Sequence, residues 1–185
     1  MLSAEKRTRT YKYIFKFENG IEKIISIDVD NSNLNIIRKN SAPQPEWTRL
    51  KNFKCPNCPL SEAEHEYCPF AINLNDIIGT FSDSFSHVKV ELTIITDERE
   101  YKKATSLQSA VSSLMGILMA SSGCPILGML KPMVRFHLPL STLEETQYRV
   151  LSMYMLAQYF KWKKGKDADW NMKMLMDILR DLKNF

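Results

Sequence analysis

Hydrophobic and polar residues alternate along the first part of the chain, as expected for a strand with one buried face. Aromatic side chains occupy every second position of residues 11–17, and the alternation resumes in residues 21–29. Between them lies Asn19-Gly20, a pair that favours the positive φ angles of a tight turn. The pattern therefore predicts a β-hairpin closed by a type I′ turn.

The same alternation recurs later in the chain. Residues 88–94 predict a strand with one buried face, and residues 100–105 are expected to pair with it after a turn at residues 96–99. Residues 34–37 are apolar enough for a short additional strand. The sequence therefore predicts a second antiparallel hairpin beside the first.

Apolar residues at helical spacing fill most of the remaining chain. The predicted helices are residues 61–68, 70–81, 107–122, 126–130, 142–163 and 167–183, of which the first is predicted from its capping pair, Ser61 with Glu64, rather than from apolar spacing. Ser106 is placed to cap the third of them. The long fifth helix has two alternative capping pairs, Ser141 with Glu144 or Thr142 with Glu145.

The order of these elements predicts one α+β domain over residues 1–185. Two antiparallel β-hairpins form a small sheet that packs against three or more α-helices. A cysteine-rich segment, residues 55–69, is inserted in this domain, and residues 167–185 form a C-terminal amphipathic helix. The chain has 185 residues, 44% of them hydrophobic and 25% charged, which is enough for one core.

Composition excludes several classes of protein. The net charge is only +4, and the basic residues are dispersed except at residues 161–166, so nucleic-acid binding is not predicted. No apolar run approaches the roughly 20 residues of a membrane helix. The N-terminus lacks the apolar region of a signal peptide, which indicates the cytoplasm, where cysteines stay reduced.

The cysteine-rich segment carries the clearest chemical signal. Three of the four cysteines and one of the three histidines follow the spacing C-x2-C-x6-H-x2-C, at Cys55, Cys58, His65 and Cys68. A Cys-x-x-Cys turn can direct two thiolates to one ion. If residues 61–68 are helical, His65 and Cys68 share a face. The four side chains then form a complete tetrahedral zinc site.

Cys124 offers a competing set of ligands. Cys55, Cys58, Cys68 and Cys124 would supply four thiolates, which suit zinc or an iron–sulfur cluster. Proline follows all four cysteines. Pro59 stands where a zinc-ribbon turn usually has glycine, which weighs against an ordinary ribbon. The fit of His65 favours zinc, and the fourth ligand stays open between His65 and Cys124.

Other interpretations of the same residues require no metal. Cys55 and Cys58 also have the spacing of a dithiol redox pair, although residues 47–54 do not resemble the buried strand that precedes such pairs. Alternatively, the cysteines are small apolar residues of a core. Arg135 and His137 are donors that could line an anion pocket, whereas anchoring of their loop in the core is the simpler interpretation.

Several blocks of the chain resemble a family of uncharacterised bacterial proteins. They are Pro45-Glu46-Trp47-Thr48-Arg49-Leu50, Cys55-Pro56-Asn57-Cys58-Pro59-Leu60, Cys68-Pro69, Ser122-Gly123-Cys124-Pro125 and Lys131 to Pro139. The resemblance covers residues 11–160 and places the C-terminal helix outside it. It implies one whole domain with no established activity, and it therefore assigns no catalytic residue.

These observations lead to three functional hypotheses. The first is a cytoplasmic protein with a structural, zinc-like cysteine site that acts by binding or regulation, with a protein partner not identified by the sequence. The second is an iron–sulfur or thiol redox protein that uses the same cysteines. The third is a metal-free interaction domain that docks a partner on residues 170–182. No catalytic triad, phosphate loop or dinucleotide fingerprint occurs, so enzymatic activity stays undecided.

Overall fold

The computed structural model describes residues 7–38, 43–52 and 54–182. Its centre is a four-stranded antiparallel sheet with the strand order β2-β1-β3-β4. The strands are β1 (Thr8–Phe17), β2 (Glu22–Asp30), β3 (Lys89–Ile95) and β4 (Glu100–Ser106). Two hairpins thus join through β1 and β3, and the predicted α+β class is confirmed.

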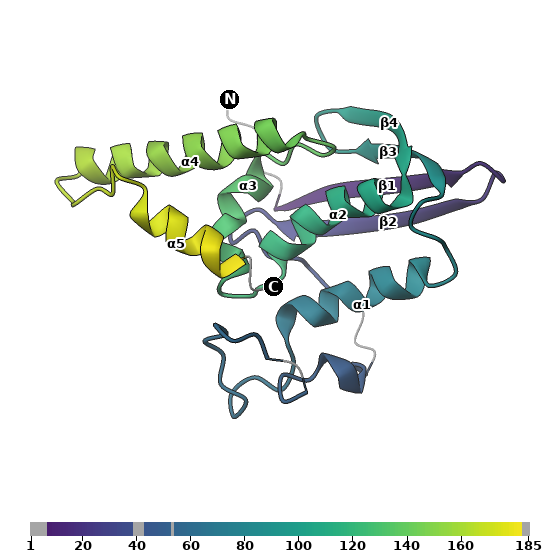
Figure 1. Cartoon of the computed structure of the whole chain (residues 1–185), viewed down its shortest axis with the longest axis horizontal. Helices are drawn as coiled ribbons and strands as arrows, with labels where there is room; N and C mark the ends of the chain where they lie inside the picture. The colour runs from purple at the N-terminus through teal and green to yellow at the C-terminus, as the bar shows by residue number, and fades with distance from the viewer. Residues whose placement is uncertain (1–6, 39–42, 53, 183–185) are drawn as a thin grey trace.

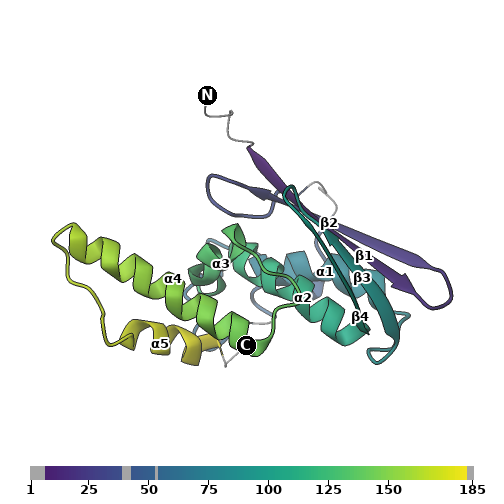
Figure 2. The ribbon, with the colours of Figure 1, turned by 90° about the horizontal axis from the view of Figure 1, so that it is seen from above.

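Helices cover one face of this sheet. Figure 2 shows α1 (Pro69–Phe81) and α2 (Leu107–Ser121) on the same side of the strands. The strand residues facing these helices are buried, and the alternation in the sequence predicts them correctly. They are Tyr11, Tyr13, Phe15, Phe17, Ile27, Val29, Val90, Leu92 and Ile94. From α2, Leu114 and Ile117 complete the core, and both are fully buried.

The turn between β1 and β2 differs from the predicted type I′ turn. Gly20 has a φ of +83°, but Asn19 is not among the residues with positive φ. The Phe17 N–H donates to the Ile21 carbonyl at 2.9 Å, and the Gly20 N–H donates to the Phe17 carbonyl at 3.0 Å. Residues 18–20 therefore form a longer loop, in which glycine alone takes the left-handed conformation.

Residues 34–37 do not form the short strand that their composition suggests. Ile36 makes an isolated bridge to Val29, and its N–H donates to the Ser121 carbonyl at 2.9 Å. Leu34 has a φ of 60°, which no extended strand accommodates. This segment therefore fastens the end of β2 to the end of α2.

The remaining helices follow α2 in the chain. They are the 3-10 helix η2 (Leu127–Leu130), α3 (Lys131–Arg135), α4 (Leu143–Lys163) and α5 (Lys173–Leu182). Ser106 caps α2, as predicted. Of the two alternatives for α4, the capping box uses Thr142 and Glu145. The last helix begins later than predicted, after a turn in which Met172 has a φ of 56°.

Two parts of the molecule lie outside the sheet and its core. Figure 1 shows α4 and α5 reaching away from the sheet at one end, and the chain around the cysteines lying beyond α1. Within the described residues, no helix has the length and apolar character needed to cross a membrane.

Candidate metal centre

Residues 48–50 pair with residues 66–68, and this short pairing joins the two ends of the loop that contains the cysteine-rich segment. The Cys68 N–H donates to the Thr48 carbonyl at 2.8 Å, and the Leu50 N–H donates to the Glu66 carbonyl at 3.0 Å. Arg49 and Tyr67 form an antiparallel bridge between them. This pairing follows the 3-10 helix η1 (Glu46–Thr48) and holds Cys68 in an extended conformation as the N-cap of α1.

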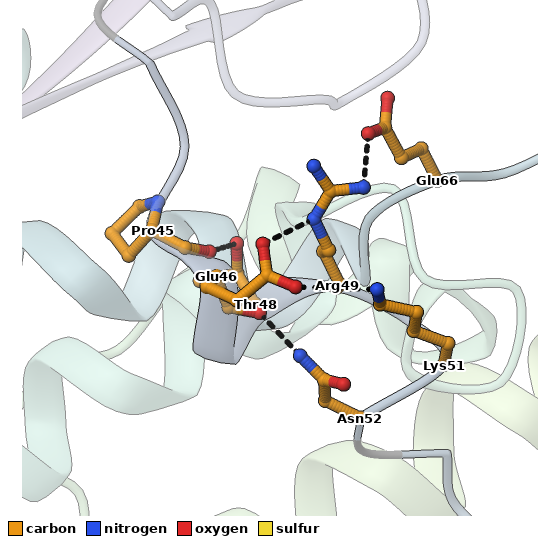
Figure 3. Close-up of polar contacts among 7 residues, drawn as sticks. All are labelled: Pro45, Glu46, Thr48, Arg49, Lys51, Asn52 and Glu66. Atoms are coloured by element: carbon orange, nitrogen blue, oxygen red, sulfur yellow. Dashed lines mark hydrogen bonds and ion pairs between the residues drawn. The ribbon is translucent and has the colours of Figure 1, made fainter.

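The side chain of Arg49 reinforces this pairing, as Figure 3 shows. Its Nε donates to Glu46 at 2.5 Å and its Nη1 forms an ion pair with Glu66 (Figure 3). Its guanidinium also lies 5.2 Å from the centre of the Tyr67 ring. The hydrogen bond from Arg49 is the main cause that lowers the pKa of Glu46, and Lys51 adds to it. Arg49 thus links both ends of the cysteine-rich segment.

Cys55 and Cys58 lie on a tight turn within this segment. The Cys58 N–H donates to the Cys55 carbonyl at 3.0 Å, so the two residues close one turn. Of residues 54–67, all described, none is buried. The segment therefore has no apolar core of its own, although both thiols are half-buried.

Cys124 approaches these cysteines from the end of α2. A Cβ placed on Gly123 would lie 3.8 Å from the Cβ of Pro69, so the residues next to Cys124 and Cys68 are in contact. The side-chain amide of Asn73 strengthens this contact, because it donates to the carbonyls of Pro69 at 2.7 Å and Ser122 at 3.4 Å. The fold therefore brings Cys124 beside the distant cysteine-rich segment.

The pKa values of Cys55 and Cys124 reflect the proximity of the four cysteines. Burial is the largest cause that raises the pKa of Cys55, followed by the charges of the other three cysteines, Cys68, Cys58 and Cys124. Burial likewise raises the pKa of Cys124, whose sulfur accepts hydrogen bonds from the N–H groups of Leu127 and Ile126 that act in the opposite direction. We refer to Cys55, Cys58, Cys68 and Cys124 as the cysteine cluster.

His65 does not share a helical face with Cys68, as the sequence had suggested. The predicted helix over residues 61–68 is wrong: a single turn forms, in which the N–H groups of Glu64 and His65 donate to the Ser61 carbonyl at 3.2 and 2.9 Å. The chain then becomes extended to pair with residues 48–50. His65 is exposed on this turn, which removes the geometric argument for it as the fourth ligand.

All four cysteines are free thiols in this structure. Over the described ranges, no group of three or more His, Cys, Asp or Glu side chains is arranged so that it could hold a metal ion. The cysteine cluster is therefore a gathering of thiols rather than a finished coordination sphere, and metal ligation by the predicted residues stays a prediction.

A separate cavity of about 610 Å³ lies between β4, α2 and α4. His137 and Arg149 line it. His137 is within 2.9 Å of the Tyr13 hydroxyl, and burial lowers its pKa to about 4. Arg149, which sequence reasoning missed, donates to the carbonyls of Met133 and Phe136. Because its guanidinium holds the loop after α3, these residues have a structural role that requires no ligand.

Residues 10–185 match the family described as a domain of unknown function (DUF6901). This agrees with the resemblance to an uncharacterised family, but the match also includes the C-terminal helix, which the sequence blocks had wrongly placed outside it. No curated protein and no solved structure matches the chain.

Proposed function

The chain belongs to this family of unknown function, and we propose that it is a cytoplasmic zinc-binding protein that acts by binding or regulation. Its ligands are the members of the cysteine cluster: Cys55, Cys58, Cys68 and Cys124. Four thiolates are a common ligand set of closed, structural zinc sites. The observation that carries the proposal is the proximity of Gly123 to Pro69, which Asn73 supports by donating to the carbonyls of Pro69 and Ser122, so that the distant Cys124 lies near Cys68.

The state of the cysteine-rich segment supports a structural role for the metal. Residues 54–67 have no buried side chain, so hydrophobic burial supplies little of the order of this loop. A metal ion would join the Cys55–Cys58 turn, the start of α1 and the end of α2. Metal binding couples to folding when the ligands come from separate segments. We therefore expect zinc to order this loop and to draw the thiols together.

The surroundings of Cys124 fit a thiolate ligand. Its sulfur accepts hydrogen bonds from two backbone N–H groups, of Leu127 and Ile126. These hydrogen bonds favour the thiolate, but burial outweighs them and raises the pKa of Cys124, so a bound metal cation would supply the charge that stabilises the thiolate. Phe70 and Met119 pack against Cys124 and its neighbours, which shields this side of the cluster from water. Hydrogen bonds to a ligand and apolar shielding from water are what the protein around a metal site typically supplies to its ligands.

An iron–sulfur cluster is the second candidate, and the same geometry favours it. When the fourth ligand is Cys124 rather than His65, the ligand set contains only sulfur, which is the usual set for iron–sulfur clusters. In that case the protein would be a redox protein. The identity of the bound metal distinguishes the two candidates.

Elemental analysis of protein purified without oxygen tests both candidates. We expect one zinc per chain in the wild type and in His65→Ala, and loss of zinc in Cys124→Ser. If the wild type instead contains iron and sulfide, and Cys124→Ser loses both, the protein is the iron–sulfur redox candidate and not the zinc protein. Loss of metal in His65→Ala with retention in Cys124→Ser would contradict the cysteine cluster. Absence of metal from every sample would leave the metal-free interaction domain as the function to pursue.

A further inference from the structure

Helix α4 is apolar along its length but is hardly buried. All of its 21 residues are described, and Gln158 is the only one of them that is buried. Its exposed large hydrophobic residues are Leu143, Tyr148, Leu151, Leu156, Tyr159, Phe160 and Trp162. A helix with apolar residues around much of its circumference normally packs against other elements. In this structure most of that surface has no neighbour.

Some residues of α4 pack against the rest of the described structure. Arg149 and Val150 line the cavity beside α2. Toward the C-terminal end of α4, the Tyr154 hydroxyl donates to Asp169 at 2.7 Å, and the Gln158 side-chain oxygen accepts from the Asp169 N–H at 3.0 Å. Next to Gln158, α4 carries an apolar row at helical spacing that we call the α4 stripe, of which Met155 is half-buried and the other members are exposed. Its members are Tyr148, Leu151, Met155, Tyr159 and Trp162.

The spacing of the α4 stripe is the same in both directions. Successive members lie three, four, four and three residues apart, which keeps them on one helical face. A second copy running antiparallel would therefore place Tyr148 opposite Trp162 and Leu151 opposite Tyr159. Met155 would lie on the two-fold axis against its own copy. Such a self-complementary patch is what a two-fold symmetric dimer requires.

The charges at the two ends of α4 favour the same arrangement. Glu144 and Glu145 lie in the first turn, and Lys161 and Lys163 lie in the last turn. An antiparallel pair brings the acidic end of one helix to the basic end of the other, whereas a parallel pair brings like charges together. The charge pattern therefore favours the antiparallel orientation for two copies of this helix.

We propose that the protein is a homodimer in which α4 pairs antiparallel with α4 of a second copy. The helix is about 31 Å long, at about 1.5 Å per residue for its 21 residues, so the stripe spans several turns. At the C-terminal end, Trp162 stacks edge-on against Trp170, with ring centres 6.4 Å apart. Trp170 thus supports the outermost aromatic of the stripe from the connection to α5.

Sedimentation equilibrium of the full chain tests the dimer. We expect a dimer for the wild type at about 10 to 100 μM, within the usual range of weak to moderate self-association. Tyr148→Glu should raise the dissociation constant of the dimer by about 100-fold or more, because symmetry places the new charge at two points of the interface. Phe85→Glu is a matched control, because Phe85 is 74% exposed and Tyr148 is 73% exposed. It should leave the dimer unchanged.

Disulfide cross-linking tests the orientation. Met155→Cys should cross-link to its own copy, because it lies on the two-fold axis, whereas Tyr148→Cys alone should not. The double variant Tyr148→Cys with Trp162→Cys should cross-link. The wild type controls for the four native thiols. Cross-linking of Tyr148→Cys alone to the same extent as Met155→Cys would indicate a parallel pair and overturn the proposal.

Charge reversal separates specific pairing from general apolar adhesion. Lys163→Glu and Glu144→Lys should each weaken the dimer by about three- to ten-fold, and their combination should restore it, because exposed ion pairs are individually weak. A monomeric wild type, or a dimer unaffected by Tyr148→Glu, would overturn the proposal. So would failure of the double reversal to restore pairing. Circular dichroism of each variant verifies that the fold is retained.

Discussion

The sheet with α2 and the cysteine-rich segment are adjacent parts of one chain, but different interactions order them. In the sheet, Tyr13, Phe15 and Leu92 have no exposed surface and belong to one core cluster with residues of α1 and α2. In the cysteine-rich segment, residues 54–67 have no buried side chain, and the ends are held by backbone pairing and by Arg49. The first region can fold on hydrophobic burial alone, whereas the second gains its order from polar contacts and, in our proposal, from a metal.

This difference explains why the two regions should respond differently to the same perturbation. Burial of apolar surface is non-directional and is spread over many side chains. A metal site concentrates its stabilisation in a few bonds that depend on thiol ionisation and metal supply. Perturbing the core should therefore affect the whole molecule, and perturbing the metal should affect one loop.

Truncation of the α2 core should have the largest effect. Leu114 is fully buried against the sheet, so Leu114→Ala should lower the free energy of unfolding by about 2–5 kcal/mol. The loss should be the same with zinc present or chelated. Leu60→Ala removes a half-buried leucine of the cysteine-rich segment and should cost less than about 1 kcal/mol. Denaturant unfolding measures both, and a zinc-dependent loss for Leu114→Ala would contradict the separation.

Acid should destabilise the sheet region through His137. Burial lowers its pKa from 6.5 to about 4, and the nearby Arg149 charge acts in the same direction. Between these values the unfolded chain binds a proton that the native protein does not, so stability is complete above pH 6.5 and falls toward pH 4. The loss should not exceed about 3.5 kcal/mol, at about 1.4 kcal/mol per pKa unit.

Unfolding measured between pH 7 and 4 checks this prediction. His137→Gln removes the titrating imidazole and should flatten the part of the pH dependence that His137 causes. The side chain lies against Tyr13 and Tyr11, so the variant is compared with itself across pH rather than with the wild type at one pH. An unchanged slope in the variant would assign the acid sensitivity to other groups.

Loss of Arg49 should have a smaller effect, confined to the cysteine-rich segment. Arg49→Gln removes the link between Glu46 and Glu66 and should weaken zinc binding by about three- to ten-fold, because it supports the ligands from outside the coordination sphere. Lys51→Gln is the matched control, since Lys51 pairs with Glu46. Competition against a chromogenic chelator measures both affinities. Equal losses in the two variants would mean that the link to Glu66 is unimportant.

The sheet could be predicted from the sequence because its signal is local. Alternation at every second residue identified β1 and β3, and Ser106 identified the start of α2. The errors arise where distant contacts override a local signal. Ser61 does close one helical turn, but the pairing of Arg49 with Tyr67 then extends the chain, and the predicted helix stops.

The candidate site depends on distant contacts for the same reason. Local spacing alone favoured His65, because it lies three residues before Cys68 in a presumed helix. The contact that brings Cys124 to Cys68 instead runs through Gly123 and Pro69, which are far apart in sequence. No periodicity encodes this contact. Similarly, Arg49 lay in a distinctive sequence block, but its ion pair with Glu66 became apparent only in the fold.

Hydrogen exchange of zinc-loaded and chelated protein tests the central contrast most directly. We predict that zinc slows exchange in residues 54–69 and 122–128, the segments that carry the cysteine cluster, and that exchange in β1, β3 and α2 stays unchanged. The His65→Ala variant should show the same response, and Cys124→Ser should show none. Zinc-dependent protection spread over the sheet, or no response around the cysteines, would contradict the account.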